Sequence, residues 1–169
     1  VAMGDLFRDR LDSCRDSLTK KLPDKVKVTD DTCFAGWDAY KKVLALNDVD
    51  MVILTEPPQF RPAHLAAAVE AGKHIFMEKP VAVDPVGVRS VIASSELADK
   101  KKLTIVAGTQ SRRIAHTMEW IKRIHDGAIG DIVGGQCVRI GGGMLTWSEA
   151  TKKRQPDWSD MEWHLRRWL

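Results

Sequence analysis

The chain has 169 residues, enough for one domain or slightly more. Hydrophobic residues make up 44% and charged residues 29%, a globular composition that argues against disorder. With 26 basic and 23 acidic residues the net charge is +3, which predicts neither a nucleic-acid nor a membrane partner. No apolar run approaches the ~20 residues that a membrane span needs.

Short apolar runs alternate with longer helical patterns in the first part of the sequence. The predicted strands are residues 1–3, 25–29, 50–55, 74–77 and 103–107, and the predicted helices are residues 5–22, 37–46, 62–71, 85–100 and 114–125. The run at 50–55 is almost continuously apolar, which is typical of a central strand covered on both faces. Asp84 and Pro85 predict an N-cap followed by proline in the first helical position.

This alternation predicts an α/β fold with a doubly wound parallel sheet, a partial dinucleotide-binding (Rossmann) domain over residues 1–127. Right-handed crossovers bring the carboxyl ends of such strands to one edge of the sheet. Ligands of these sheets bind at that edge. The residues that directly follow each strand are therefore the first candidates for a functional site.

After Gly130 the pattern changes to a longer predicted strand at 131–140, a polar basic loop, and an aromatic and basic helix from Trp158. We expect a boundary near Ala128. Residues 128–169 are then the beginning of a second domain.

A dinucleotide site needs a glycine-rich turn after the first strand, and an acidic residue about 20 positions later for the ribose hydroxyls. Asp5 follows a strand tail and stands where that acidic residue is expected, which places the glycines before residue 1. Gly141–Gly143 follow a strand but precede no helix, so they are rejected as a phosphate loop. The sequence is therefore expected to be a fragment lacking the glycine-rich turn and most of the second domain.

No metal site is expected, because Cys14, Cys33 and Cys137 lie far apart and form no Cys-x-x-Cys pair. His64 lies in an alanine-rich predicted helix, and a packed histidine is the simpler interpretation than a ligand.

The segment Glu78-Lys79-Pro80 is the strongest candidate for chemistry, because it follows a predicted strand. A lysine there can donate to a substrate hydroxyl and help to move its proton, and lysine changes its pKa readily when desolvated or placed near charge. Glu78 can orient it, and the Lys79–Pro80 bond can be cis. A surface lysine after a strand is the alternative, and these three residues alone favour it.

Several motifs together resemble one known family. They are Asp-Met-Val-Ile-Leu-Thr-Glu-Pro-Pro at 50–58, His64, Ala-Gly-Lys-His at 71–74 and Glu-Lys-Pro at 78–80. Their order and spacing resemble the glucose–fructose oxidoreductase/inositol dehydrogenase (Gfo/Idh/MocA) family over roughly residues 1 to 140. The segment 158–162, Trp-Ser-Asp-Met-Glu, is similar to one bacterial branch of it.

The resemblance implies an N-terminal Rossmann domain, and it implies that residues 128–169 begin a C-terminal α/β domain that binds substrate and whose large open sheet forms a homo-oligomer. It implies hydride transfer between a nicotinamide and a sugar or polyol carbon, with Lys79 as the catalytic lysine and Pro80 beside the nicotinamide. The resemblance implies further cofactor contacts at Thr55, Pro57, Gln59, Glu78, Lys79, Gln110 and Arg112. Asp5 matches the residue that holds the adenosine ribose, and its carboxylate repels a 2′-phosphate, so NAD is expected rather than NADP.

Two other functions stay open. One is glycoside hydrolysis assisted by transient oxidation with bound NAD, which some relatives use. The other is a non-catalytic Rossmann-like module for binding or oligomerisation. The fragment is expected to be inactive alone, and its compartment is expected to be the cytoplasm or the periplasm.

Overall fold

The computed structural model describes residues 1–138, 140 and 154–167. The chain divides into two compact units, Val1–Ser111 and Arg112–Leu169, and each is described by itself. The domain boundary expected near residue 128 stays a prediction. The glycine cluster at 141–143 lies outside the described residues.

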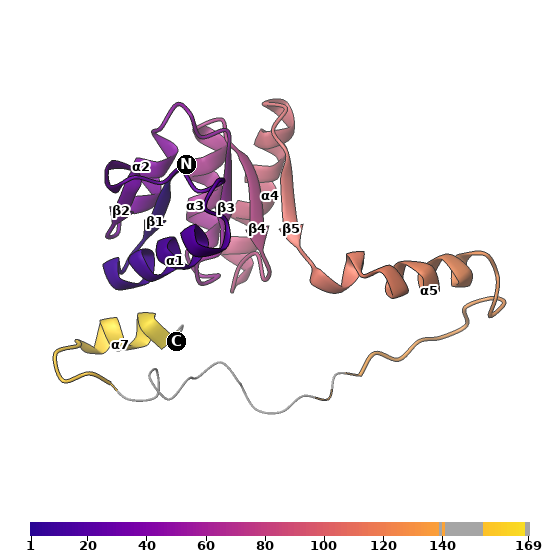
Figure 1. Ribbon diagram of the computed structural model, residues 1–169. Coiled ribbons are helices and arrows are strands. Elements are labelled where there is room, and N and C mark those ends of the chain that lie inside the picture. Colours follow the sequence, from indigo (N-terminus) through magenta and orange to yellow (C-terminus); the bar gives the residue numbers. More distant parts are fainter. Residues whose placement is uncertain (139, 141–153, 168–169) are drawn as a thin grey trace. The chain divides into compact units, whose positions relative to one another are not determined.

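The first unit alternates strands and helices in chain order (Figure 1). Its strands are β1 (Met3–Asp5), β2 (Cys33–Ala35), β3 (Met51–Leu54), β4 (His74–Glu78) and β5 (Ile105–Gly108). Its helices are α1 (Arg8–Lys21), α2 (Ala39–Leu44), α3 (Arg61–Glu70) and α4 (Pro85–Lys100). Short 3₁₀ turns lie at Asp30–Thr32 and Gln110–Arg113, the second of which crosses into the second unit.

Every strand pair of the first unit is parallel, which confirms the predicted α/β class. The strands form two separate sheets, β1–β2 and β3–β4–β5, and not one continuous sheet. In the larger sheet Leu54 pairs with Met77 and Glu78 pairs with Gly108. This register aligns the carboxyl ends of the three strands.

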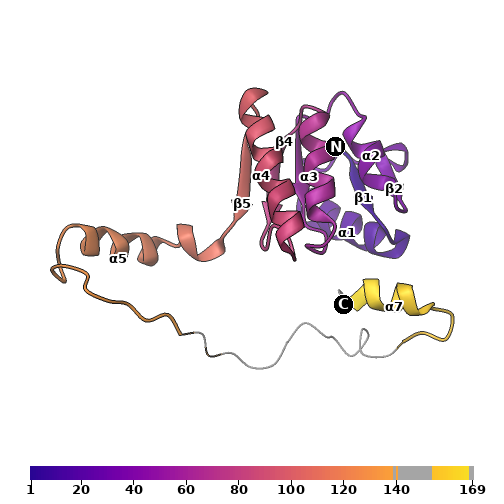
Figure 2. The same ribbon diagram turned by 180° about the vertical axis from the view of Figure 1, so that it is seen from behind.

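Helices α3 and α4 lie on the same side of the three-stranded sheet, as the front and back views show (Figures 1 and 2). Beneath them lies the main hydrophobic core, which includes Val52, Leu54, Leu65, Ala68, Val69, Ile75, Met77, Val91 and Ala98. The opposite face of β3 is open, because Met51 is 56% exposed and Ile53 is 62% exposed. The prediction that strand 50–55 is covered on both faces is therefore wrong for this unit.

Local sequence signals explain how α4 begins and packs. Oδ1 of Asp84 accepts a hydrogen bond from the backbone N–H of Gly87 at 2.6 Å, which confirms the predicted N-cap. A Cβ at Gly87 would lie 2.9 Å from Cβ of Ala82 and 3.1 Å from Cγ of Pro62. The absent side chain thus lets the start of α4 approach the start of α3 closely.

Two strand predictions near the N-terminus need correction. Residues 25–29 form no strand. The strand β2 lies at Cys33–Ala35 instead, where Cys33 is buried and pairs with Met3 of β1. The first strand ends at Asp5, and the first helix begins at Arg8 rather than at Asp5. The reason is local: Oδ1 of Asp5 accepts from the N–H of Phe7 at 2.8 Å and holds a turn between strand and helix.

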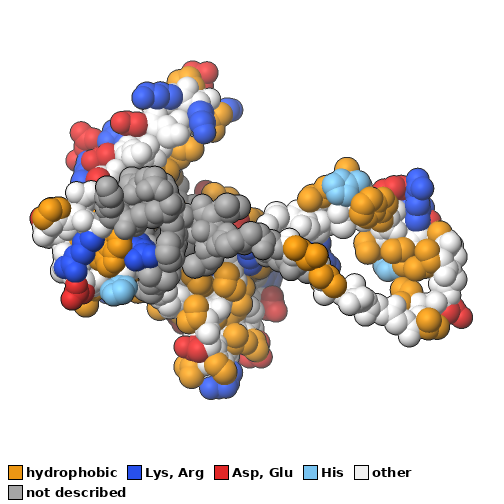
Figure 3. Space-filling view, turned by 90° about the horizontal axis from the view of Figure 1, so that it is seen from below, with side chains coloured by type: hydrophobic (Ala, Val, Ile, Leu, Met, Phe, Trp, Pro, Cys, Tyr) orange, Lys and Arg blue, Asp and Glu red, His pale blue; other side chains and the backbone are white. Residues whose placement is uncertain are grey.

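The second unit contains α5 (Ala115–His125) and α7 (Asp160–Arg167) among its described residues. Hydrophobic and histidine side chains gather over the α5 region, on the right of Figure 3. The strand predicted at 131–140 is wrong for the described residues of that stretch, since none pairs with another strand and Val133 is 99% exposed. Across the described ranges, no helix combines the length and apolarity of a membrane span, and no cluster of metal-ligating side chains occurs.

Within the first unit, helices cover only one face of the larger sheet. Two neighbouring substitutions in β3 of the 169-residue chain should therefore lower the free energy of unfolding by very different amounts. Leu54→Ala removes a buried side chain beneath α3 and should lower the free energy of unfolding by about 2–5 kcal/mol. Ile53→Ala removes an exposed side chain and should cost about 0.5 kcal/mol or less. Urea unfolding measures both values, and equal losses would mean that the second face is covered.

An ion pair predicts how stability changes in acid. Nη1 of Arg15 donates to Oδ1 of Asp30 at 2.6 Å, and this hydrogen bond, with the nearby charge, lowers the pKa of Asp30. The stabilisation is therefore complete above the ordinary aspartate pKa and is lost as the pH falls through the lowered value. Asp30→Asn should lower Tm slightly at neutral pH, with no difference left in strong acid. A difference that persists unchanged in acid would contradict this assignment.

Candidate functional site

The parallel register gathers the candidate residues of the larger sheet at one edge. Leu54 lies beside Met77, so the loop that follows β3 and the loop that follows β4 leave the sheet next to each other. Glu78 lies beside Gly108, so the segment after β5 leaves at the same edge. We call this the carboxyl edge, with residues 55–59, 78–80 and 109–111.

Lys79 and Pro80 both lie exposed at the carboxyl edge, and the peptide bond between them is cis, as the sequence suggested. Among the described residues, the Lys79 ammonium makes no hydrogen bond and no ion pair. It is therefore available to a ligand that approaches this edge.

Glu78 fixes the backbone of Lys79 and not its ammonium. Its Oε2 accepts a hydrogen bond from the N–H of Lys79 at 3.2 Å. The carboxylate lies against β5, where a Cβ at Gly108 would be 2.9 Å from each of its oxygens. Gly108 thus leaves the space that this half-buried carboxylate occupies.

The loop after β3 carries three of the predicted cofactor contacts. Thr55 and Gln59 are exposed, and Pro57 is half-buried. The carbonyl of Pro57 accepts from the N–H of Phe60 at 3.1 Å, a turn that leads the loop into α3. Thr55 and Gln59 thus face solvent at the carboxyl edge.

Arg61, which the sequence analysis did not single out, connects the two loops. Its Nη2 donates to the carbonyl of Glu56 and its Nη1 donates to the carbonyl of Pro80. Arg61 is only 2% exposed, although arginine is almost always at least partly in water. Sequence reasoning missed it because an arginine at the start of an alanine-rich helix has the pattern of a surface residue.

Asp5 ends β1, at the carboxyl edge of the smaller sheet. Oδ1 is used by Phe7, while Oδ2 makes no hydrogen bond within the described part of the chain. The carbonyl of Asp5 accepts from the N–H of Gly36 at 3.0 Å, which joins the ends of β1 and β2. One carboxylate oxygen is therefore left for a ligand.

Aromatic side chains join the two sheets near their carboxyl edges. Trp37, which follows β2, meets Phe60 edge-on with ring centroids 6.1 Å apart. His64 stacks on Tyr40 at 4.1 Å, and its Nδ1 lies 3.3 Å from Oε1 of Glu56. His64 is thus a packed side chain, as the sequence predicted.

The two remaining predicted contacts follow β5. Gln110 is exposed in the 3₁₀ turn after this strand, within the first unit. Arg112 is the first residue of the second unit, and its role stays a prediction.

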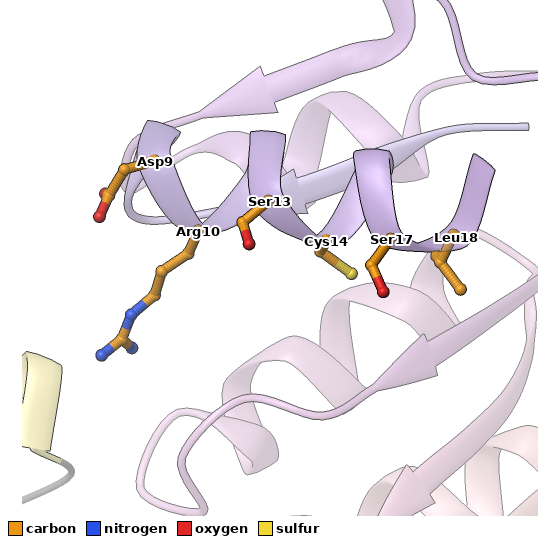
Figure 4. A pocket seen from close by; sticks show the side chains of 6 residues that line it. All are labelled: Asp9, Arg10, Ser13, Cys14, Ser17 and Leu18. Carbon is orange, nitrogen blue, oxygen red and sulfur yellow. The ribbon is translucent and has the colours of Figure 1, made fainter. Parts of the chain in front are cut away.

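The hollows described in the structure lie elsewhere. The recess in Figure 4 has a volume of about 460 Å³, and all its labelled side chains come from one side of α1: Asp9, Arg10, Ser13, Cys14, Ser17 and Leu18. Because one helix supplies the whole lining, no chemistry converges there from several elements. The carboxyl edge stays the better candidate.

Comparison with known proteins points to the same part of the chain. The family model described as an oxidoreductase family with an NAD-binding Rossmann fold (GFO_IDH_MocA) matches residues 17–109. A glycosyl hydrolase family 109 protein of Streptomyces coelicolor is 29% identical over 98 residues, which are 58% of this chain and 20% of that protein. An inositol 2-dehydrogenase/D-chiro-inositol 3-dehydrogenase of Halalkalibacterium halodurans is 33% identical over 91 residues, 54% of this chain and 26% of that protein.

Solved structures share the fold. The scyllo-inositol dehydrogenase of Lactobacillus casei with bound NAD(H) and scyllo-inositol is 21% identical, with a TM-score of 0.61 over 77% of this chain and 34% of that one. A 3-ketoreductase of Actinomadura kijaniata, in complex with TDP-benzene and NADP, is 20% identical, with a TM-score of 0.57 over 78% of this chain and 36% of that one. The chain thus spans about a third or less of the proteins that it matches.

Proposed function

Since the chain belongs to the Gfo/Idh/MocA family of NAD-binding oxidoreductases, we propose that it carries the cofactor side of a sugar or polyol dehydrogenase. The reaction transfers a hydride between nicotinamide and the hydroxyl-bearing carbon of the substrate. The similarity to an inositol dehydrogenase supports a polyol substrate. Because the chain covers only part of its relatives, the activity belongs to the full-length protein, and the 169 residues alone are expected to be inactive.

The observation that carries the proposal is the position of Lys79. Its ammonium is exposed at the carboxyl edge, while its backbone is held by Glu78 on one side and its neighbour Pro80 is held by Arg61 on the other. A flexible charged side chain on a fixed backbone is suited to proton transfer with a substrate hydroxyl. In this proposal the neutral amine form of Lys79 accepts the hydroxyl proton, and its ammonium form donates a proton in the reverse direction. Bound NAD would accept the hydride from the same carbon.

Two parts of NAD find suitable groups among the described residues: the adenosine ribose at Asp5 and the nicotinamide near Lys79. Oδ2 of Asp5 is left to accept from ribose hydroxyls, and a carboxylate there disfavours a 2′-phosphate, which supports NAD over NADP. In this proposal Thr55, Pro57 and Gln59, in the loop after β3, contact the cofactor between its adenosine ribose and its nicotinamide. Bound NAD would supply the hydride acceptor, and the protein's part is to orient it and to move the proton.

The remaining predicted residues surround the reacting groups in this proposal. In this proposal Pro80 packs beside the nicotinamide, and Glu78 holds the backbone of the site by accepting the hydrogen bond from Lys79 N–H. In this proposal Gln110, in the turn after β5, contacts nicotinamide or substrate, and the role that the resemblance implies for Arg112 stays a prediction. A homo-oligomer through the second domain completes the proposed enzyme.

A second candidate function is redox-assisted glycoside cleavage with bound NAD. It is favoured by the similarity to the family 109 glycosyl hydrolase protein. The products separate the two: a dehydrogenase accumulates a keto-polyol together with NADH, whereas the hydrolase releases a sugar with no net change in NADH.

Replacing Lys79 tests the catalytic assignment in the full-length protein. Lys79→Ala should reduce turnover by about 100- to 10,000-fold, because the proton of the substrate hydroxyl loses its acceptor. Binding of NAD, measured by calorimetry, should change by less than about threefold, because the lysine acts mainly in the transition state.

The matched control is Lys100→Ala, an exposed lysine at the end of α4 that precedes β5. It should leave both turnover and NAD binding unchanged. Equal turnover in Lys79→Ala and the unmodified enzyme would remove Lys79 from the mechanism.

Asp5 tests the cofactor preference. Asp5→Asn keeps the Oδ1 acceptor for Phe7 but removes the negative charge, so NAD should bind about 10- to 100-fold more weakly while NADP binds no worse. Fluorescence titration with each cofactor gives the ratio, and Asp24→Asn, in the turn after α1, serves as the control. An unchanged NAD-to-NADP ratio would contradict the ribose assignment.

A further inference from the structure

Arg61 carries a buried charge for which the proposed chemistry gives no role. It is the first residue of α3 and is 2% exposed, and no carboxylate contacts its guanidinium among the described residues. Its two terminal nitrogens donate to the carbonyls of Glu56 and Pro80, while Nε is buried without a hydrogen-bond partner in the described structure. Removing a guanidinium from water is costly unless hydrogen bonds replace the lost hydration.

The two carbonyls belong to the two loops that carry the proposed site. Glu56 lies in the loop 55–59 after β3, and Pro80 directly follows Lys79. The guanidinium is planar and rigid, so its two terminal nitrogens fix the separation of the two acceptors. A loop carbonyl that moved away would leave a buried N–H without a partner, and therefore neither loop can shift alone.

The same helix offers a contrast at its other end. Nζ of Lys101 donates to the carbonyls of Val69 and Glu70 at 3.1 Å each, and so caps the last turn of α3. That contact also joins a cation to two backbone carbonyls. It lies at the opposite edge of the sheet, where the strands begin. Lys101 thus stabilises the fold without contact to either loop of the carboxyl edge.

From this geometry we infer that Arg61 is a positioning residue, which sets the Lys79–Pro80 segment at a fixed distance from the cofactor loop 55–59. This role rests on the proposed dehydrogenase function. Arg61 acts through the backbone of Pro80 and Glu56 and touches neither cofactor nor substrate. Losing it should misplace the lysine relative to the nicotinamide, while each loop keeps its own side chains.

The test compares Arg61→Met with Lys101→Met in the full-length protein. Each substitution removes a cation that donates hydrogen bonds to two backbone carbonyls, so each should lower Tm. Arg61→Met should lower kcat by about 10- to 100-fold, because a displacement of about 1 Å at the reacting groups can cost that much. Lys101→Met should leave kcat unchanged. A kcat for Arg61→Met within twofold of the unmodified enzyme would overturn the proposal.

Two further measurements keep the outcome decisive. Arg61→Lys retains the charge but cannot span both carbonyls, so it should fold and should lie between the unmodified enzyme and Arg61→Met in kcat. Hydrogen exchange followed by mass spectrometry needs no activity, and it should show faster exchange at 55–60 and 78–83 in both Arg61 variants but not in Lys101→Met.

These readouts separate the two proposals. If the unmodified full-length protein oxidises no sugar or polyol, the proposed function fails, and exchange at the two loops then decides the role of Arg61. Unchanged exchange in both Arg61 variants would overturn the role, whatever the reaction.

Discussion

The parallel pairing of β3 with β4 is the constraint on which the candidate site depends. By placing Leu54 beside Met77, it makes two loops that are about 20 residues apart in the sequence leave the sheet side by side. The buried faces of both strands, with Val52 and Ile75, lie under α3 and hold this register, because a slip by one residue would expose them. The position proposed for Lys79 follows from this alignment and from the connection through α3.

The edge combines fixed backbone with free side chains. The carbonyl of Pro80 is held by Arg61 and the N–H of Lys79 by Glu78, yet the Lys79 ammonium is exposed. Such a division suits an enzyme, since the backbone defines where a proton acceptor can reach and the side chain supplies the movement. The buried charge of Arg61 destabilises the fold unless both carbonyls stay in place, so the same interaction couples stability to the geometry of the site.

The sequence predicted the elements whose signals are local. Asp84 and Pro85 predicted the start of α4, and the alanine-rich run predicted α3. Both predictions were possible because capping and helical periodicity depend on residues that are close in sequence. It failed at β2, since a three-residue strand is chosen by its partner and by the burial of Cys33 rather than by alternation at 25–29. It also missed Arg61, whose acceptor on Pro80 is 19 residues away, a contact that no local pattern encodes.

The central claim is that the carboxyl edge binds NAD with its nicotinamide beside Lys79. A crystal structure of the full-length protein with NAD and a polyol tests it most directly. The account predicts that the Lys79 ammonium lies within about 3 Å of the substrate hydroxyl and that both Arg61 hydrogen bonds persist. A nicotinamide bound away from this edge, with the Lys79 side chain directed into bulk water, would contradict it.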